Sequence, residues 1–591
     1  MTDRFSEQLP ALGAQLSRRQ FLRRAAAIGV TASFAAGLLS ACGGDNNDNT
    51  PTGNGAATSS SGSSGTTGSP AGSAASPGTG AGSDQSANVK DGGTITFGAW
   101  QTPDTMDPQK TGLAATSRIL FQAMTPLVWK FPDGDEFYPG LATEWEISSD
   151  GLEYTFKLRQ DVKFHNGEPF NADAVTWTFD RMADPSQQTL ATLAFFDHTE
   201  KVDDYTAKLV FKKPYGPFLG LLSGSVAYMP IPPKQSKDDP DQFGLTPAGT
   251  GPFIIKDYVS KSHATLERNP DYNWAPEDYF KRNGPAKLEK INWKIIEEPA
   301  TRVATLQSGE IDMAEDVAAP MVAQVQSDKR FQMILHDTLG CPRTVMLNCE
   351  KPPLDDKVVR QALSYAVNKQ TITQSVFKGT VDIRYGPIEP LTPAYNPEVE
   401  KYYHFDAEKA KQLLDQAGWT VNQSTGIREK DGQPLKLLFI VVANDGFDEP
   451  AQVIQSNFKD IGVDLELRNE AEPTVFNTYN RGDQHLANIF WWGTDPQSLY
   501  SLYHSSNIEK GFNWSHYRNA DVDKLLEDGQ IPTNLEERKP HYEKAQIQIM
   551  EDAASIPVWG KRVIIGAKKE IAGMAWSQNI YPIFYNAGFT E

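Results

Sequence analysis

A long low-complexity segment divides this chain into a part that cannot form a core and a part that must form one. Residues 43–88 are rich in Gly, Ser, Thr, Pro and Ala and include no aromatic residue. Such a segment buries too little apolar surface to offset its backbone entropy. We therefore expect residues 43–89 to be a disordered tether, whose r.m.s. span would be about 35–40 Å for a Gly/Ser-like chain of this length.

The residues before the tether have the pattern of an export signal. Two arginine pairs, Arg18-Arg19 and Arg23-Arg24, precede an uncharged run from Ala25 to Leu39. This run is shorter than the ~20 residues that a membrane-spanning helix needs. Because an adjacent arginine pair is typical of twin-arginine signals, residues 1–42 are predicted to be a signal peptide of that type.

A lipoprotein cleavage box ends this signal. Leu39-Ser40-Ala41-Cys42-Gly43 resembles the site at which bacterial lipoproteins are processed, where the cysteine is lipidated and becomes the first mature residue. Several acyl chains on one residue hold a protein to a bilayer stably, whereas a single chain holds it only marginally. The chain is thus predicted to be exported and anchored through Cys42 to the outer face of the cytoplasmic membrane, or to be periplasmic.

The remaining body, about 500 residues long, is too long for a single hydrophobic core and predicts two or three domains. Its sequence contains no further apolar run long enough to span a membrane. The whole chain carries 75 acidic and 56 basic residues, which gives a formal net charge of −19. This acidity argues against a nucleic-acid partner and against direct adsorption to anionic lipid.

The body combines patterns typical of strands and of helices. Asp150-Gly151 separates two extended runs, the second of which alternates apolar and polar residues over 154–158, and this predicts a hairpin with one buried face. The nearly continuous apolar run from Leu435 to Ala443 predicts a strand buried on both faces. Helices are predicted over 356–368 and 407–417, so the body is expected to be α/β.

No motif in the sequence indicates catalysis. The nine histidines are scattered, and the chain has neither an H-E-x-x-H motif nor a phosphate-binding G-x-x-x-x-G-K motif. Cys341 and Cys349 are the only cysteines after Cys42, and two cysteines without nearby histidines are no zinc site. An exported protein can form disulfides, so a bond between these two stays open. We predict no catalytic residue, no metal and no cofactor.

Short motifs along the body carry a resemblance to one family. They are Gly92-Gly93-Thr94-Ile95-Thr96, Pro103 to Pro108, Pro139 to Trp145, Phe164 to Phe170, Gly249 to Phe253, Leu266 to Tyr272, Leu306 to Asp312 and Arg360 to Ala366. In this order, and behind a lipoprotein signal, they resemble the peptide/nickel class, family 5, of extracellular solute-binding proteins of ATP-driven (ABC) importers. The resemblance covers nearly all of residues 90–591.

The resemblance implies a type II periplasmic-binding-protein fold of the large cluster, in which two α/β lobes enclose a solute and are joined by two hinge crossings. Lobe one would comprise residues 90–340, with an extra subdomain at 126–244, and residues 556–591 would return to it. Lobe two would comprise residues 341–555. The protein would capture a peptide-like solute as a monomer and deliver it to the permease subunits of an ABC transporter.

The resemblance also implies a binding site. In peptide-binding relatives a Trp-rich segment carries an aspartate that pairs with the ligand's α-amino group, and Asp495 of Trp491-Trp492-Gly493-Thr494-Asp495 matches it. A carboxylate in a closing, water-poor cleft forms a strong charge-assisted bond to an ammonium. Alternatively, Trp491 and Trp492 are core residues and Asp495 only caps a helix. The other ligand contacts that we predict are Gln101, Thr102 and Asn444.

The chain departs from dipeptide-binding relatives in one respect. These relatives have an arginine after the strand that matches Leu435–Val442, and that arginine binds the ligand's carboxylate. Residues 443–450 of this chain contain acidic residues but no arginine or lysine, which favours longer peptides or an amine without such a carboxylate. Oligosaccharides and metal chelates are alternative ligands. A secreted hydrolase and a scaffold without a ligand are alternative classes of protein.

Overall fold

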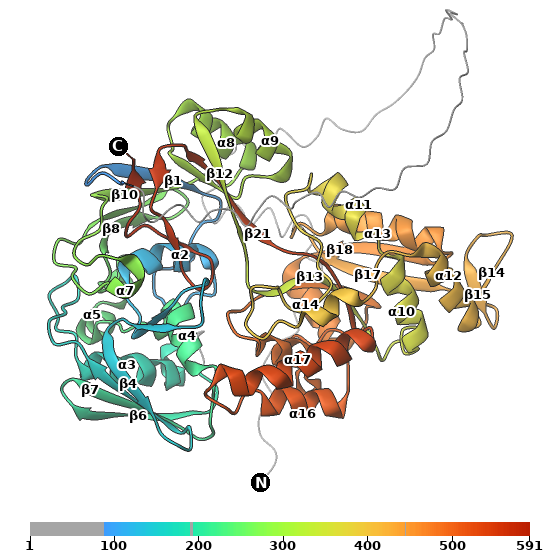
Figure 1. Ribbon diagram of the computed structural model, residues 1–591, viewed down its shortest axis with the longest axis horizontal. Helices are drawn as coiled ribbons and strands as arrows, with labels where there is room; N and C mark the ends of the chain where they lie inside the picture. The colour runs from blue at the N-terminus through green and yellow to red at the C-terminus, as the bar shows by residue number, and fades with distance from the viewer. Residues whose placement is uncertain (1–87, 190–192, 444, 591) are drawn as a thin grey trace, which may run out of the picture. The chain divides into compact units, whose positions relative to one another are not determined.

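Two β-sheets organise the part of the chain that the computed structural model describes, which is residues 88–189, 193–443 and 445–590 (Figure 1). The predicted signal peptide, Cys42 and nearly all of the predicted tether lie outside these residues. The first sheet has seven strands in the order β12-β21-β11-β1-β10-β9-β8, and the second has five in the order β18-β17-β19-β13-β20.

The strands of the first sheet are β12 (Phe331–Asp337), β21 (Arg562–Lys568), β11 (Met313–Glu315), β1 (Thr94–Ala99), β10 (Lys290–Ile295), β9 (His263–Arg268) and β8 (Phe253–Val259). The strands of the second sheet are β18 (Asp464–Glu470), β17 (Lys436–Val442), β19 (Leu486–Trp492), β13 (Gly340–Leu347) and β20 (Ser555–Trp559). β17 pairs with β18 on one side and β19 on the other. This position confirms the buried strand predicted from the apolar run.

Helices pack around both sheets. The main helices are α2 (Ala114–Ala123), α8 (Pro299–Ser308), α9 (Ala319–Ser327), α10 (Lys357–Ala366), α12 (Ala407–Gln416), α13 (Asp448–Asp460), α14 (Glu472–Arg481), α15 (Ser498–Tyr503), α16 (Ala520–Asp528) and α17 (Leu535–Glu551). The two predicted helices are confirmed as α10 and α12. Asp406 caps α12 by accepting a hydrogen bond from the backbone N–H of Lys409 at 2.8 Å, and Gly418 follows its end with a φ of +84°.

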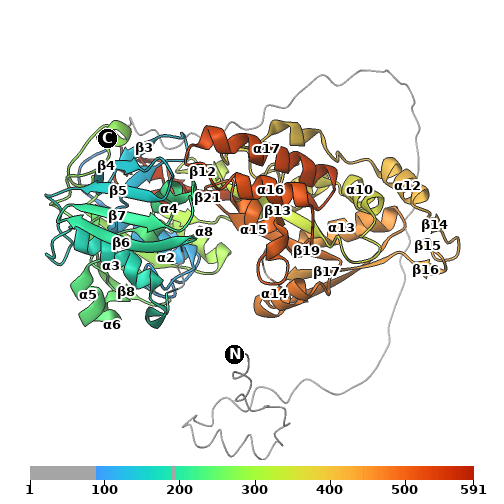
Figure 2. The same cartoon turned by 90° about the horizontal axis from the view of Figure 1, so that it is seen from below.

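A third, four-stranded sheet lies in the region between residues 140 and 215. Its order is β4-β5-β7-β6, and Figure 2 shows α3 beside it. The elements are β4 (Ala142–Ile147), β5 (Glu153–Leu158), β7 (Thr206–Phe211), β6 (Phe196–Asp203) and α3 (Ala172–Ala183). β4 and β5 form the hairpin predicted around Asp150-Gly151, and the alternate residues Tyr154, Phe156 and Leu158 are buried.

Two chain segments connect the first sheet to the second. β12 continues through residues 338–339 into β13, and β20 continues through residues 560–561 into β21. The connections lie side by side, because β12 and β21 pair antiparallel up to Asp337 and Arg562. The backbone N–H and the hydroxyl of Thr338 also donate to the carbonyl oxygen of Lys561, at 3.2 and 3.1 Å. We call these segments the two crossings.

Largely buried ion pairs hold the residues around the crossings. Arg562 pairs with Asp337 at 2.5 Å, and Arg384 pairs with Glu389 at 2.5 Å. Glu389 Oε1 also accepts a hydrogen bond from the backbone N–H of Lys561 at 3.2 Å. Burial raises the pKa of Glu389 to about 7, although Arg384 opposes this shift. Loss of one partner of such a buried pair is strongly destabilising, because the other charge is left buried and unpaired. The ion pairs therefore hold the residues around the crossings in one arrangement.

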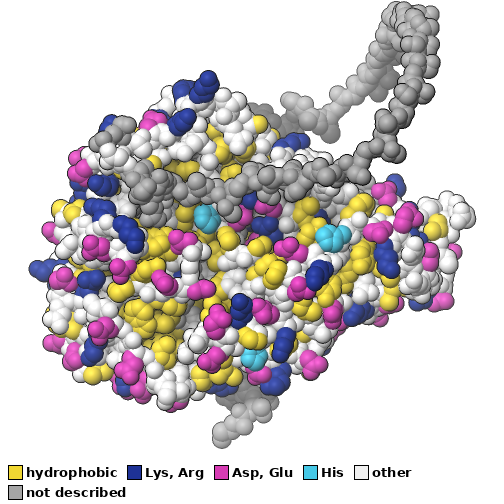
Figure 3. All heavy atoms as spheres, in the orientation of Figure 1, with side chains coloured by type: hydrophobic (Ala, Val, Ile, Leu, Met, Phe, Trp, Pro, Cys, Tyr) yellow, Lys and Arg dark blue, Asp and Glu magenta, His cyan; other side chains and the backbone are white. Residues whose placement is uncertain are grey.

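The two ends of the described body lie beside each other, because Val89 forms an antiparallel bridge with Thr590. No helix among the described residues has the length and hydrophobicity required to cross a membrane. Acidic and basic side chains are interspersed over the face of the molecule shown in Figure 3. The negative net charge is therefore not gathered into one patch on this face.

The first crossing depends on a glycine. Gly340 has a φ of +99°, and a Cβ added there would lie 2.1 Å from the carbonyl oxygen of Trp491 and 2.6 Å from the backbone nitrogen of Gly493. An L-residue would thus combine backbone strain, of order 1–3 kcal/mol, with a clash against backbone atoms. We predict that Gly340→Ala lowers the thermal melting temperature markedly.

The matched control is Gly284→Ala. Gly284 has a similar φ of +93°, but no atom lies within 4 Å of an added Cβ. This variant therefore carries the strain without the clash, and it should lower the melting temperature less. Equal decreases for the two variants, measured by calorimetry, would contradict the close approach at Gly340.

Candidate functional site

The Trp-rich segment leaves the second sheet at the end of β19. Trp491 and Trp492 point to opposite faces of this strand, as neighbouring strand residues do. The Trp491 ring contacts Phe512, 4.6 Å away between ring centroids, on the helix-covered face of the second sheet. The Trp492 ring faces Tyr581, which follows the first sheet in the chain, at 6.5 Å. Trp492 is therefore the tryptophan that reaches across from one side of the crossings to the other.

A pocket of about 260 Å³ lies beside this segment, and we call it the Trp492 pocket. We call the part of the body that contains the first sheet the first side, and the part that contains the second sheet the second side. The walls of the pocket come from both sides. The second side contributes Trp491, Trp492, Gly493, Thr494, Asp495, Gln497, Ser498 and Ser501, and the first side contributes Leu221, Gly224, Ser225 and Asn579. The structure thus brings five of the predicted residues, Trp491 to Asp495, to one pocket. Ser498 Oγ is buried there and has no hydrogen-bond partner among the described residues.

The carboxylate of Asp495 is already paired. Arg538 of α17 donates two hydrogen bonds to it, Nη1 to Oδ2 at 2.7 Å and Nη2 to Oδ1 at 2.6 Å. Oδ1 also accepts from the backbone N–H of Gln497 at 2.8 Å. Asp495 is nevertheless not the helix cap that the alternative interpretation expected, because α15 begins at Ser498 and its N-cap residue is Gln497. Burial alone would lower the pKa of Arg538, but Asp495 outweighs it and holds that pKa above its usual value. A ligand ammonium would have to share this ion pair.

The other predicted contacts lie elsewhere or outside the described residues. Gln101 and Thr102 follow β1, where the Thr102 hydroxyl donates to Glu297 at 2.9 Å, and neither lines the Trp492 pocket. Asn444 lies outside the described residues. Cys341 and Cys349 are both free thiols, so the disulfide that the sequence left open is not formed. Among the described residues no three His, Cys, Asp or Glu side chains are grouped to hold a metal ion.

A cluster of charged and aromatic side chains around Trp492 was not identified from the sequence. We call it the Lys561 cluster. It consists of Arg118, Glu315, Asp316, Arg343, Phe490, Trp492, Lys561 and Tyr581. The signal was present in the sequence, because Lys561-Arg562 interrupts the otherwise uncharged run 555–567 and Arg343 stands inside a strand that is buried throughout. A charge in a buried segment requires a partner or a function.

Arg343 changes the interpretation of the acidic stretch 443–450. Its Nη1 donates to Asp445 Oδ2 at 3.1 Å, and Asn488 donates to the same oxygen at 2.6 Å. The guanidinium also lies over the ring of Phe490, 4.0 Å from its centroid. Asp445 is therefore paired with a cation that comes from β13, although the stretch 443–450 itself contains no basic residue.

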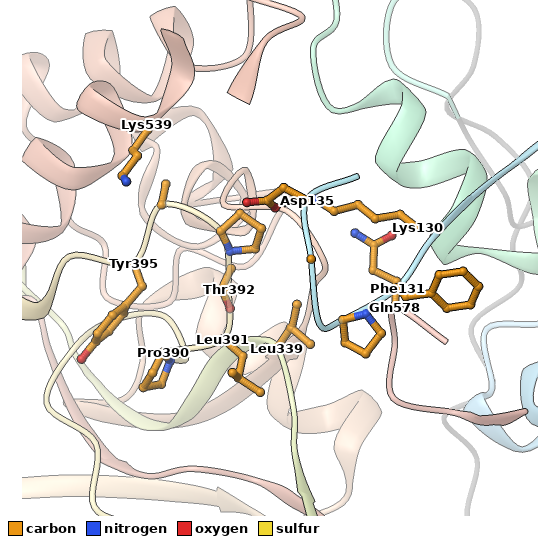
Figure 4. Close-up of a pocket in the computed structure, with 14 residues that line it drawn as sticks. Lys130, Phe131, Asp135, Leu339, Pro390, Leu391, Thr392, Tyr395, Lys539 and Gln578 are labelled. Carbon is orange, nitrogen blue, oxygen red and sulfur yellow. Dashed lines mark hydrogen bonds and ion pairs between the residues drawn. The ribbon is translucent and has the colours of Figure 1, made fainter. Parts of the chain in front are cut away.

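A second hollow, of about 300 Å³, opens on the other side of Gln578. Figure 4 shows Lys130, Phe131 and Asp135 on one wall and the segment 390–395 on another, with Lys539 of α17 above. Gln578 lines this hollow and donates to the carbonyl oxygen of Thr494, which lines the Trp492 pocket, at 3.4 Å. Gln578 therefore separates the two spaces.

Sequence comparison identifies the family. Residues 136–513 match the family described as bacterial extracellular solute-binding proteins, family 5 Middle. The chain belongs to this family. It is 31% identical over 481 residues to heme-binding protein A of Haemophilus influenzae, which covers 76% of this chain and 83% of that protein. It is 27% identical to the dipeptide-binding protein of Escherichia coli, covering 74% of this chain and 83% of the relative.

Structural comparison confirms the fold. The structure of NikA from Brucella suis, solved in complex with Fe(III)-EDTA, superposes with a TM-score of 0.76 at 28% identity, and it covers 84% of this chain and all of the other. The predicted α/β periplasmic-binding-protein fold is thus confirmed. The protein is an extracytoplasmic solute-binding component of an ABC importer, and its function is binding rather than catalysis.

The ion pair in the Trp492 pocket leads to a stability prediction. The side chains of Asp495 and Arg538 are 13% and 4% exposed. Asp495→Asn leaves Arg538 buried without a counter-charge, so we expect a loss of about 3–5 kcal/mol in the free energy of unfolding. Replacing both residues by apolar side chains, as in Asp495→Leu with Arg538→Met, should cost much less than the single change. Chemical denaturation of the variants measures both.

The matched control is the exposed pair between Lys524 and Asp528. These side chains are 72% and 34% exposed, so Asp528→Asn should change the free energy of unfolding by less than about 1 kcal/mol. If Asp495→Asn cost no more than Asp528→Asn, the ion pair with Arg538 would not contribute as the structure indicates.

Proposed function

We propose that this protein is a lipid-anchored, peptide-binding component of an ABC importer. Residues 90–340 and 556–591 would form one lobe and residues 341–555 the other, and a peptide-like solute would be enclosed between them. The observation that carries the proposal is the Trp492 pocket, whose walls come from both sides of the two crossings. A pocket built in this way exists only when the two sides are close together.

Closure explains how such a protein reports that it is loaded. Ligand contacts on both lobes are made together only in the closed state, so the ligand shifts the population towards that state. Contacts between the two sides include Tyr215, whose hydroxyl donates to Gln497 at 2.9 Å, and Gly216, whose N–H donates to the carbonyl oxygen of Gln530 at 2.9 Å. We propose that the permease recognises the closed form.

The chemistry of the pocket supports a peptide-like solute. Ser498 Oγ in the pocket, and Gln578 Oε1 between the pocket and the second hollow, are buried without partners among the described residues, and they suit the N–H and C=O groups of a peptide backbone. Trp492 supplies an apolar wall beside them. A carboxylate accepts up to about four hydrogen bonds, so Asp495 can receive a ligand ammonium while it keeps Arg538.

A binding experiment tests both the peptide and the closure. We expect a pool of tri- to pentapeptides to bind the protein, to reduce its radius of gyration in solution scattering, and to be recovered chemically unchanged. N-acetylation should weaken binding about thirty-fold or more if an enclosed carboxylate meets the ammonium. Equal affinity for the acetylated pool would reject the role of Asp495, and unchanged dimensions at saturation would reject closure.

The lipid anchor has its own test. In the wild type we expect the protein in the membrane fraction, whereas Cys42→Ala should release it, because the residue that would carry the acyl chains is gone. Cys349→Ala removes a thiol that the structure shows in the body and serves as the matched control. If Cys42→Ala remained in the membrane fraction, Cys42 would not be the anchor.

A further inference from the structure

Lys561 is a cation without an acidic partner in the middle of the molecule. It lies in the second crossing, and its Nζ is 4.4 Å from the ring centroid of Phe490 and 4.6 Å from that of Trp492. Among the described residues no carboxylate lies within 4.0 Å of this ammonium. Lys561 is half-buried, and contacts with aromatic faces replace only part of the hydration that its ammonium loses. The ammonium is therefore left with unused capacity to bind an anion.

The backbone of Lys561 is held firmly, so its side chain has a fixed origin. The N–H donates to Glu389 at 3.2 Å, and the carbonyl oxygen accepts two hydrogen bonds from Thr338. A group anchored in this way costs less entropy to position than one on a loop. Because Thr338 belongs to the first crossing, Lys561 sits where the two crossings meet.

The charges around Lys561 are paired with one another. Arg118 and Glu315 form a buried ion pair at 2.9 Å, and Arg343 pairs with Asp445 at 3.1 Å. Asp316, which is exposed, is the remaining acidic neighbour, and it makes no ion pair within 4.0 Å among the described residues. Two buried atoms of the first pair, Arg118 Nη1 and Glu315 Oε2, have no hydrogen-bond partner among those residues. Such orphaned atoms mark a place for further polar groups.

We infer that Lys561 binds an acidic group of the solute, and that the solute is an organic carboxylate whose carbon skeleton lies against Trp492. This inference rests on the proposed function, because Trp492 belongs to the Lys561 cluster and also lines the pocket in which the solute would be enclosed. It adds a ligand class and a residue that the Trp-rich segment did not indicate.

The surroundings favour a singly charged carboxylate. Lys561 is the one cation of the cluster without a close counter-charge among the described residues, and its unpaired acidic neighbour Asp316 would repel a phosphate dianion more strongly than a singly charged carboxylate. Arg343 donates one hydrogen bond, to Asp445, so its Nε and Nη2 are without partners among the described residues and can also face the acid.

Binding of an anion at this place depends on pH. Burial, followed by Arg343 and Arg118, lowers the pKa of Lys561 to about 7, and Asp316 and Glu315 only partly oppose this. A bound carboxylate favours the charged form and raises that pKa. Affinity for the carboxylate is therefore highest at pH values below about 7 at which the ligand is still ionised, and it falls as the pH rises above about 7, by up to tenfold per unit.

The test uses a matched pair of small probes and the full-length protein. 3-Phenylpropionate has a carboxylate and an aromatic ring, and 3-phenylpropionamide is its neutral counterpart. We expect calorimetry at pH 6.5 to show about thirty-fold tighter binding of the carboxylate. Between pH 6.5 and 9 the affinity of the carboxylate should fall, while that of the amide stays constant. Equal affinities, or no binding of the carboxylate at millimolar concentration, would overturn the inference.

Two lysine variants locate the effect. Lys561→Met should remove both the preference for the carboxylate and its pH dependence. Lys569→Met deletes the same charge at an exposed position beyond the end of β21 and should leave both unchanged. If Lys561→Met retained the preference, Lys561 would not be the anion contact. The comparison of the two probes in the wild-type protein stands even if that variant folds poorly.

The same measurements separate this inference from the proposed function. If the peptide pool binds and closes the protein but the probes show no preference, the function stands and the anion site is rejected. If the carboxylate probe binds through Lys561 while peptides do not bind, the anion site stands and the peptide is rejected as the solute.

Discussion

The pairing of β12 with β21 is the constraint on which the rest of the molecule depends. These two strands pair antiparallel with each other at one edge of the first sheet. One short segment connects each of them to a strand of the second sheet. Within the described residues the chain therefore passes between the two sheets at this one place, where Arg562 forms a buried ion pair with Asp337. A single location for both crossings leaves the remaining surfaces of the two sides free to approach or separate.

The binding residues follow from this arrangement. β13 begins at Gly340, where the first crossing ends, and its backbone touches that of Trp491 and Gly493. Lys561 extends from the second crossing towards Phe490 and Trp492 of the same neighbouring strand. Both crossings thus contact β19 directly. A movement at the crossings cannot leave the Trp492 pocket unchanged, and a solute in the pocket acts on the crossings without an intervening chain of contacts.

The sequence predicted the elements that are determined by short stretches of residues, and the resemblance to the family predicted the overall fold. The hairpin at Asp150-Gly151 and the helices α10 and α12 are set by local periodicity and capping, and the fold came from motifs spread along the body. The partners within the site could not be predicted in this way. Asp495 and Arg538 are 43 residues apart and meet only because α17 packs beside the Trp-rich segment. A family motif shows where a carboxylate lies in the chain, but not whether its charge is already neutralised.

Arg343 and Lys561 illustrate the same limit from the other side. Neither belongs to a recognised motif, and each was visible only as a charge inside an apolar stretch. Their partners, Asp445 and the rings of Phe490 and Trp492, come from other strands of the second sheet or from the residues that follow them. Contacts of this kind depend on sheet order, which local patterns do not specify.

The bridge between Val89 and Thr590 has a consequence for engineering. The two ends of the described body meet on the side of the first sheet, at a distance that a few residues can span. The chain could therefore be circularly permuted, with a short linker joining these ends and new termini opened in a surface loop of the second side. A fluorescent domain inserted at such termini would turn a change between open and closed forms into an optical signal.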